Sequence, residues 1–283
     1  MAHLLRDRFT ACQLRMELSR EHLDSLQTEI GAINAAFKKD ELFDIVQDND
    51  PDSGYSIFRL RQLKPIPTAR LGVLVGDVVH QARSAFDNLI EALNIREVGH
   101  ATPNTEFPIY ENENVFLRGR TERGKRRIRP ASDKMGRISA EAVEIIKELQ
   151  PYHRGDDYTS HPLWILHHLW IMDKHRNPSV VASIGQNTGN IKPRIRSADG
   201  RPATVSIHEI IAPEFFPFED GAEICRIRWN RTPNLEMEVH QEMTLYIALR
   251  HDQPGGRHPL EPMLRECVAY AAGALARFEP FFM

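Results

Sequence analysis

The chain has 283 residues, 41% hydrophobic and 27% charged, with a formal net charge of -3, and this composition is that of a soluble protein with one large core or two modest ones. Its cysteines, Cys12, Cys225 and Cys267, lie far apart and form no Cys-x-x-Cys pair, which argues against a disulfide scaffold and a thiolate zinc site. Early charges interrupt any signal peptide and no apolar run reaches the roughly 18 residues of a membrane span, so we expect a cytoplasmic protein with no membrane partner.

Residues 2–38 predict one long helix. Apolar side chains recur there at alternating steps of four and three, the spacing that keeps a narrow seam on one side of a helix. The seam consists of Leu5, Phe9, Cys12, Met16, Ser19, Leu23, Leu26, Ile30, Ile33 and Phe37. It either packs within a helical bundle or forms a homodimer with a second copy.

The next two stretches predict a small β-hairpin. Residues 41–48 and 55–62 flank NDPDSG, a cluster of turn formers. In the second stretch Phe58 and Leu60 alternate with Arg59 and Arg61, so one face of the hairpin is expected to meet water.

A second long helix is predicted over residues 69–96, with Thr68 as its cap after two prolines. One side of this helix carries a polar stripe at steps of three and four, formed by Asp77, His80, Ser84, Asp87 and Glu91, with Arg83 beside it. A surface helix has a similar stripe, so the stripe alone does not identify a site.

Residues 118–129 form a basic segment on an otherwise acidic chain. Its cationic side chains are Arg118, Arg120, Arg123, Lys125, Arg126, Arg127 and Arg129. Arginine predominates, and its guanidinium group binds oxyanions bidentately, which favours a phosphate backbone such as that of RNA. The alternative is a solvated loop whose arginines pair with acids on the body of the protein.

A short helix over residues 139–150 is expected to end at Pro151, and Ser160 with Pro162 in the first turn is expected to start an apolar helix over residues 163–176. That helix ends in four titratable or charged residues, Asp173, Lys174, His175 and Arg176. Charges at the rim of a core must pair or do chemistry, because desolvating an unpaired charge is costly.

From residue 178 to residue 250 apolar and polar residues alternate, which predicts an antiparallel sheet of four or more strands, and a last helix is expected over residues 260–278. The fold class is therefore α+β: a helical bundle with a long N-terminal helix, a small hairpin, and a C-terminal antiparallel sheet closed by the last helix. We expect a helical region at 1–178, with the hairpin at 41–62 and the basic loop at 118–129 inserted, packed as one unit with a sheet region at 179–283.

The polar stripe and the charged end of the apolar helix together suggest a site. Its candidate members are His80, Arg83, Asp87, Asp173, Lys174, His175 and Arg176. If the two helices pack antiparallel, these side chains meet in one pocket. One imidazole then accepts the proton of a ribose 2′-hydroxyl, the other protonates the leaving oxygen, the cations hold the phosphate and the aspartates orient the imidazoles. This chemistry is that of a metal-independent ribonuclease of the defence or toxin type.

Four segments carry a resemblance. They are GDVVHQARSAFDNLI at 76–90, FPI at 107–109, LQPYH at 149–153 and PLWILHHLWIMDKHR at 162–176. In this order they resemble a family of uncharacterised bacterial and phage proteins that share a helix of the type G-(E/D)-x-x-H-x-x-R-S-A-L-D-H-L and a later D-K-H-R. The resemblance covers residues 64–178 and implies no particular activity.

A second likeness is to the HEPN superfamily of helical ribonucleases and toxins, whose signature is an arginine followed at short spacing by a histidine. Arg83 has the spacing, but Asn88 stands where the histidine belongs and cannot transfer protons, so the likeness implies a ribonuclease only if His80 or His175 takes its place. The competing hypothesis is a non-catalytic module. In that case Arg83 with Asp173, or Asp87 with Lys174, forms a buried ion pair, the long first helix mediates oligomerisation and the sheet binds a protein partner.

A metal site is the third alternative, because His161, His168 and His175 recur every seven residues. Positions seven apart lie roughly 10 Å from each other along a helix, so at most one or two of them bind a single ion and no metal is expected. No nucleotide-binding glycine motif is present, so no cofactor is expected either. His167 and His168 are expected to be core histidines bonded to the backbone.

Overall fold

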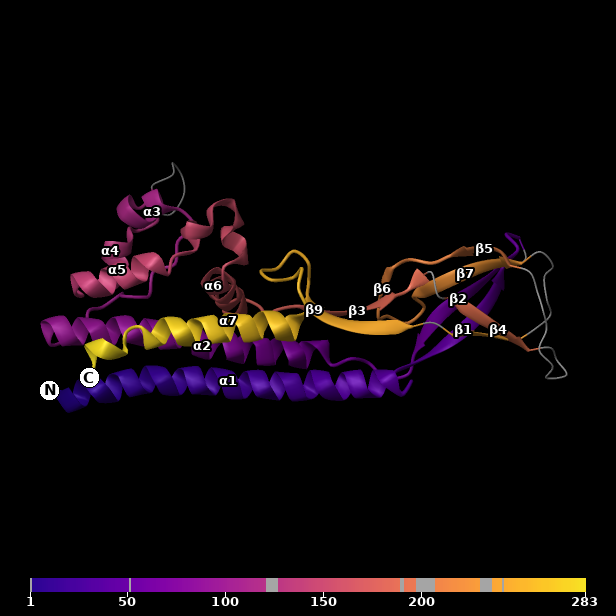
Figure 1. Cartoon of the computed structure of the whole chain (residues 1–283), viewed down its shortest axis with the longest axis horizontal. Helices are drawn as coiled ribbons and strands as arrows, with labels where there is room; N and C mark the ends of the chain where they lie inside the picture. Colours follow the sequence, from indigo (N-terminus) through magenta and orange to yellow (C-terminus); the bar gives the residue numbers. More distant parts are fainter. Residues whose placement is uncertain are drawn as a thin grey trace. The chain divides into compact units, whose positions relative to one another are not determined.

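The computed structural model describes residues 2–50, 52–120, 127–188, 191–196, 207–229, 236–240 and 242–283 (Figure 1). The chain divides into two compact units. The helical unit comprises Met1–Gln27, Ala69–Ser179 and Leu249–Met283, and the strand unit comprises Thr28–Thr68 and Val180–Ala248. The predicted α+β class is confirmed.

The helices lie close to the positions that the sequence predicts. They are α1 (Ala2–Lys38), α2 (Thr68–Val98), α3 (Glu113–Arg118), α4 (Ala131–Met135), α5 (Ala140–Glu148), the 3-10 helix η1 (Pro151–Ser160), α6 (Pro162–Asp173), α7 (Leu260–Ala276) and the 3-10 helix η3 (Glu279–Phe281).

Three helices run side by side in the helical unit (Figure 1). The hydroxyl of Ser19 donates to the carbonyl oxygen of Val78 at 2.9 Å and Arg8 pairs with Glu91 at 2.8 Å, so α1 and α2 are antiparallel. Side-chain contacts towards both ends of α7 hold it against α1. The predicted seam of α1 is buried here at Phe9, Cys12, Met16, Ser19, Leu23 and Leu26. Packing of the seam within the bundle is therefore confirmed for this part of α1.

The bounds of α6 differ from the prediction at both ends. Its N-cap is His161 rather than Ser160, because the residue before a proline is driven out of the helical region and its ring Nδ1 accepts the N–H of Leu163 at 3.2 Å. The helix ends at Asp173, and residues 174–176 form turns closed on the carbonyls of residues 170 and 172. Three of the four charged residues at the end of this segment thus lie outside the helix.

The strands are β1 (Phe43–Asp50), β2 (Tyr55–Gln62), β3 (Val180–Gln186), β4 (Lys192–Arg196), β5 (Ile207–Ile211), β6 (Phe215–Pro217), β7 (Glu223–Trp229), β8 (Glu236–His240) and β9 (Met243–Leu249). They form a four-stranded sheet of order β1-β2-β7-β5, a three-stranded sheet of order β6-β3-β9 and the pair β4-β8. The predicted antiparallel strands after residue 178 are therefore confirmed, and among the described residues they are distributed over more than one sheet.

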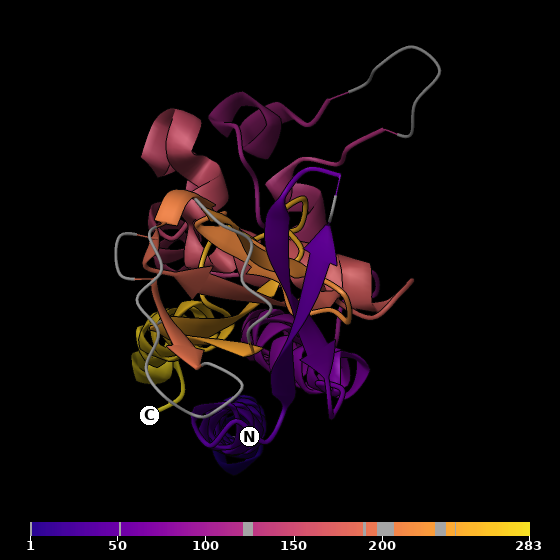
Figure 2. The same cartoon turned by 90° about the vertical axis from the view of Figure 1, so that its right-hand side faces the viewer.

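The hairpin is part of the four-stranded sheet. Phe58 of β2 pairs with Cys225 of β7, and both side chains are buried (Figure 2, purple beside orange). Phe58 and Leu60 thus lie on the buried face of β2, and β2 pairs with β7 in the same sheet. The two compact units consequently differ from the predicted division near residue 178: the hairpin belongs with the later strands and α7 belongs with the helices.

Candidate functional site

Two glycines of α2 let the end of the α6 segment approach the α2 backbone. A Cβ atom at Gly76 would overlap the carboxylate of Asp173, and one at Gly72 would overlap the carbonyl oxygen of Pro178. Glycine inside a helix costs roughly 1 kcal/mol relative to alanine, and close approach of a second backbone is what offsets that cost here. The structure therefore brings the two charged helix segments together.

Arg83 and Asp87 form an ion pair on α2. Only 1% of Arg83 is exposed, and its Nη2 lies 3.0 Å from Oδ1 of Asp87. The same nitrogen donates to the carbonyl oxygen of Phe107 at 2.8 Å, and the N–H of Phe107 donates to Asp87 at 2.9 Å. Burial raises the pKa of Asp87, although the Arg83 charge opposes this rise. The pair clamps Phe107 to α2, and a guanidinium group so deeply buried is out of reach of a substrate.

Trp170 of α6 lies between two cations. The guanidinium carbon of Arg83 is 5.3 Å from the centre of the indole ring, and Nζ of Lys174 is 3.2 Å from it. Both are cation–π contacts. The sequence suggested an ion pair of Arg83 with Asp173 or of Asp87 with Lys174. In the structure Arg83 instead pairs with Asp87 within α2, and Lys174 contacts the ring of Trp170.

His80 and Asp173 lie at the same helix contact but nearer the surface. Burial raises the pKa of the Asp173 carboxyl group, the charge of His80 lowers it, and that of Asp77 raises it. The side chain of His80 is exposed. These two predicted residues are therefore neighbours, and Arg83 and Asp87 lie further along α2 in the core.

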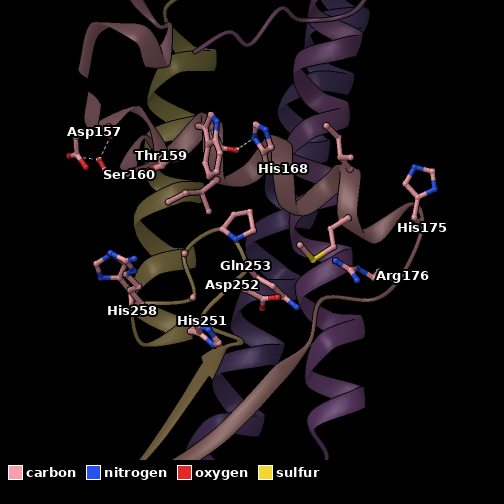
Figure 3. A pocket seen from close by; sticks show the side chains of 18 residues that line it. Asp157, Thr159, Ser160, His168, His175, Arg176, His251, Asp252, Gln253 and His258 are labelled. Carbon is pink, nitrogen blue, oxygen red and sulfur yellow. Dashed lines mark hydrogen bonds between the residues drawn. The ribbon is translucent and has the colours of Figure 1, made fainter. Parts of the chain in front are cut away.

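His175 and Arg176 line a separate pocket of about 810 Å³ within the helical unit (Figure 3). One wall is α6, with Trp164, His168 and Met172, and the other is the loop at residues 251–258. None of His80, Arg83, Asp87 and Asp173 lines this pocket. The predicted site is thus divided: its last two members line this pocket, and the imidazole of His175 lies at its edge, apart from His251 and His258 (Figure 3).

The loop opposite α6 is fixed by a glycine turn and by Gln253. Gly255 has a φ of 75°, in the left-handed region, and a Cβ at Gly256 would overlap the carbonyl oxygen of Arg250. The buried amide of Gln253 accepts the N–H of Ser179 at 3.1 Å. These contacts hold the loop beside the residues that follow α6, so the pocket is preformed.

Two arginines and two aspartates lie in the lining of the pocket, and both aspartates have partners. Asp252 is neutralised by Arg250, whose Nε lies 2.6 Å from its carboxylate. Asp157 accepts the hydroxyl of Ser160 at 2.7 Å. Within the part of the chain that the structure describes, Arg176 and Arg257 have no ion-pair partner. The lining also holds the imidazoles of His175, His251 and His258.

Sequence reasoning missed His251, Arg257 and His258. The signal is RHDQPGGRHP at residues 250–259, in which two basic and imidazole pairs flank a Gly-Gly turn. A Gly-Gly pair indicates a turn but not what the turn faces, because the hydrogen bond from Ser179 to Gln253 joins residues far apart in the chain.

The histidines of α6 have distinct partners. The Nδ1–H of His168 donates to the carbonyl oxygen of Trp164 at 2.9 Å, so the predicted backbone bond is confirmed for His168. For His167 it is wrong, since its Nδ1 is buried and has no hydrogen-bond partner among the described residues. Burial lowers the pKa of His167 to about 2, with help from the Arg83 charge, so this imidazole is neutral.

The metal alternative involved His161, His168 and His175. Nδ1 of His161 is engaged in capping α6 and its Nε2 lies 3.2 Å from the hydroxyl of Tyr270, while burial lowers its pKa to about 4. Within the described ranges, no group of three or more His, Cys, Asp or Glu side chains is placed to hold a metal ion.

The basic segment is described only at its two ends. Arg123, Lys125 and Arg126 lie outside the described residues, whereas Arg118, Arg120 and Arg127 are exposed. Backbone bonds of 3.0 and 2.8 Å join Arg120 and Ile128. Arg129 lies 3.6 Å from Glu106. Arg129 therefore pairs with an acid outside the basic segment, as the alternative of a solvated, ion-paired loop predicts for this residue.

Comparisons of the chain with protein-family models, with curated proteins and with solved structures give no match. Among the described residues, no helix combines the length and the apolar character that a membrane span needs.

Proposed function

We propose that the protein is RNA-directed and that the pocket between α6 and the loop at residues 251–258 binds a phosphate group of RNA. The observation that carries this proposal is that one cavity is lined by three histidines and by two arginines, Arg176 and Arg257, that lack a carboxylate partner among the described residues. Arginine forks bind phosphate oxygens bidentately, and an arginine without a carboxylate partner attracts an anion.

The same lining supports metal-independent cleavage. Imidazole both accepts and donates protons near neutral pH. One histidine, His251 or His258, takes the proton of the ribose 2′-hydroxyl, whose oxygen attacks the adjacent phosphorus. His175 on the other wall protonates the departing 5′-oxygen, so the phosphodiester bond breaks and a cyclic phosphate forms. Arg176 and Arg257 stabilise the charge that grows on the phosphate oxygens.

The residues predicted at the helix contact support this pocket indirectly. The clamp of Arg83 and Asp87, together with the indole of Trp170, fixes α6 on α2 and thereby sets the position of residues 174–176. We further propose that the exposed arginines at the ends of the basic segment steer the strand, and that the protein acts in the cytoplasm, which suits three free, buried cysteines.

The decisive experiment incubates the full chain with labelled single-stranded RNA in EDTA. We expect cleavage by the wild type and a loss of rate of about 100-fold or more in His175→Ala and in His251→Ala. His80→Ala is the matched control, because His80 is exposed on α2 and lies outside the pocket lining, and its rate should match that of the wild type.

The other outcomes discriminate among sites and functions. Loss of cleavage in His80→Ala but not in His251→Ala would move the site to the α2–α6 contact. Cleavage that EDTA abolishes would contradict the metal-independent mechanism. RNA binding that weakens steeply with salt, without any cleavage, would show that the protein binds RNA but is not a ribonuclease.

A second candidate function is an oligomeric interaction module. Leu14 and Leu18, one turn apart on α1, are 53% and 42% exposed, which is the pattern expected of a helix face that meets a second copy of the chain. In the strand unit an apolar groove of about 620 Å³ along β3 and β6, with Phe215 exposed, would suit a protein partner.

Light scattering coupled to gel filtration tests the α1 dimer. The wild type is expected to elute as a dimer and Leu14→Glu/Leu18→Glu as a monomer, because two buried carboxylates are too costly at an apolar interface. A wild type that is monomeric at the highest concentration reached would contradict this candidate.

A further inference from the structure

A smaller cavity lies on the other side of the Trp164 and His168 rings. Its volume is about 190 Å³, and it is bounded by Tyr110, Val115 and His167 as well as by these two rings. Trp164 and His168 stack with their centres 4.0 Å apart and their planes 25° apart. The phosphate pocket proposed above shares both rings, so this stacked pair forms the partition between the two cavities.

The walls of the small cavity combine aromatic rings with charged and polar side chains, including Glu111, Arg120 and Lys134. Tyr110 is held by Phe116, whose ring lies edge-on at 5.7 Å. Nζ of Lys134 lies 4.9 Å from the Tyr110 ring and 3.1 Å from Glu106, so its charge is already compensated. Pockets for drug-sized ligands measure roughly 300–1,000 Å³, so this one suits a single flat ring system.

Two polar groups of the lining lack partners. Nε1 of Trp164 and Nδ1 of His167 are buried, and neither has a hydrogen-bond partner in the described part of the chain. Burying such groups unpaired costs roughly 1–3 kcal/mol each, and a polar ligand relieves that cost once the ring turns its nitrogen towards the cavity. Since burial holds the pKa of His167 at about 2, its ring is neutral and offers one donor and one acceptor.

The lining thus joins aromatic faces to polar side chains, among them Glu111 and Asn112, and this combination suits the face and the edge of a nucleobase. Single-stranded RNA is recognised by stacking its bases on aromatic side chains and by hydrogen bonds to their edges. We propose that this cavity takes one base of the RNA strand whose phosphate occupies the larger pocket. The inference rests on the proposed function only for the identity of the strand, since the cavity itself would also bind a free nucleoside.

Nucleosides test the inference separately from the ribonuclease proposal, because they carry no phosphate. Adenosine, guanosine, cytidine and uridine are titrated singly into the full chain and followed by calorimetry. We expect saturable binding of at least one of them. Val115→Phe adds a ring to a half-buried residue of the lining and should weaken that binding by about tenfold or more.

Leu117→Phe is the matched control, because Leu117 lies on the same short helix α3 but is 53% exposed and does not line the cavity. Its affinity should equal that of the wild type. Circular dichroism must show the wild-type melting temperature for both variants. If Val115→Phe does not fold, wild-type binding to an oligoribonucleotide is compared with binding to its abasic counterpart, which should be about tenfold weaker.

Absence of nucleoside binding, or unchanged affinity in folded Val115→Phe, overturns the inference even if RNA is bound and cleaved. Equal affinity for the intact and the abasic oligonucleotide also overturns it. Nucleoside binding that Val115→Phe removes, in a chain that does not cleave RNA, supports the base cavity while the ribonuclease proposal fails.

Discussion

At the scale of single residues, Arg83 carries a full charge into the core of the helical unit, where Asp87 is its counter-ion. Asp87→Asn keeps an oxygen for the N–H of Phe107 but removes the negative charge. Because a buried guanidinium group then lacks its counter-charge, we expect the free energy of unfolding to fall by about 3 kcal/mol. Urea unfolding followed by circular dichroism measures the change.

Glu144→Gln is the control for this substitution, since Glu144 forms an exposed pair with Lys147 and should change stability by about 0.5 kcal/mol or less. Equal effects of the two substitutions would show that Asp87 does not stabilise the buried charge. Glu106, whose charge also acts on Arg83, would then be the group to test next.

The same residues show what side-chain patterns reveal. The polar stripe on the second long helix, with Arg83 beside it, drew attention to Arg83 and Asp87. Their shared partner is the backbone of Phe107, however, and a side-chain pattern contains no information on backbone groups. His251 and His258 were missed for a related reason, because the contact that places their loop is a backbone amide bonded to Gln253.

At the scale of elements, the close approach of α2 and the α6 segment depends on Gly76. Gly76→Ala places a Cβ on the Asp173 carboxylate, so either that side chain or the helix must shift. We expect a loss of about 1–3 kcal/mol, as for other overpacked contacts. Thermal unfolding followed by circular dichroism should show a lower midpoint.

Gly273→Ala is expected to change the stability in the opposite direction. Gly273 lies inside α7, and a Cβ there meets no atom within 4 Å, so the substitution should stabilise the chain by up to about 1 kcal/mol through helix propensity alone. If both substitutions raised the melting temperature, α2 and the α6 segment would not be in close contact.

Element bounds were largely predictable, whereas strand partners were not. Periodicity of three to four residues predicted α1, α2 and α7, and alternation predicted β2, β7 and β9, because each pattern is local. Pairing of β2 with β7 joins segments that are distant in the chain, and alternation says which face of a strand is buried but not against which strand.

At the scale of the whole molecule, the chain enters each unit more than once. It leaves the helical unit after Gln27, returns at Ala69, leaves again after Ser179 and returns at Leu249. A boundary placed by composition near residue 178 therefore captures only one of these crossings. The candidate pocket combines segments on both sides of that boundary, so their positions in the sequence did not indicate that they share one site.

The stability of the whole chain should depend on pH through buried histidines, and His161 is the clearest case. Its folded pKa is about 4 against an ordinary value of 6.5, chiefly because of burial. The neutral form is thus favoured in the folded state, so this contribution is fully present above about pH 6.5 and is lost as pH falls towards 4. His161→Asn keeps a side chain that caps helices but removes the titration.

Chemical unfolding at a series of pH values from 7 to 4 measures the effect as the difference between wild type and His161→Asn. Over the lower part of this range, we expect the free energy of unfolding of the wild type to fall by about 1 kcal/mol more per pH unit than that of the variant. The reason is that His161 is protonated in the unfolded chain but stays neutral in the folded one. Changes common to both proteins, such as those from Asp87 and Asp173, cancel in the difference. Parallel stability curves would mean that His161 is protonated in the folded chain without cost, and that neither its cap on α6 nor its contact with Tyr270 requires the neutral ring.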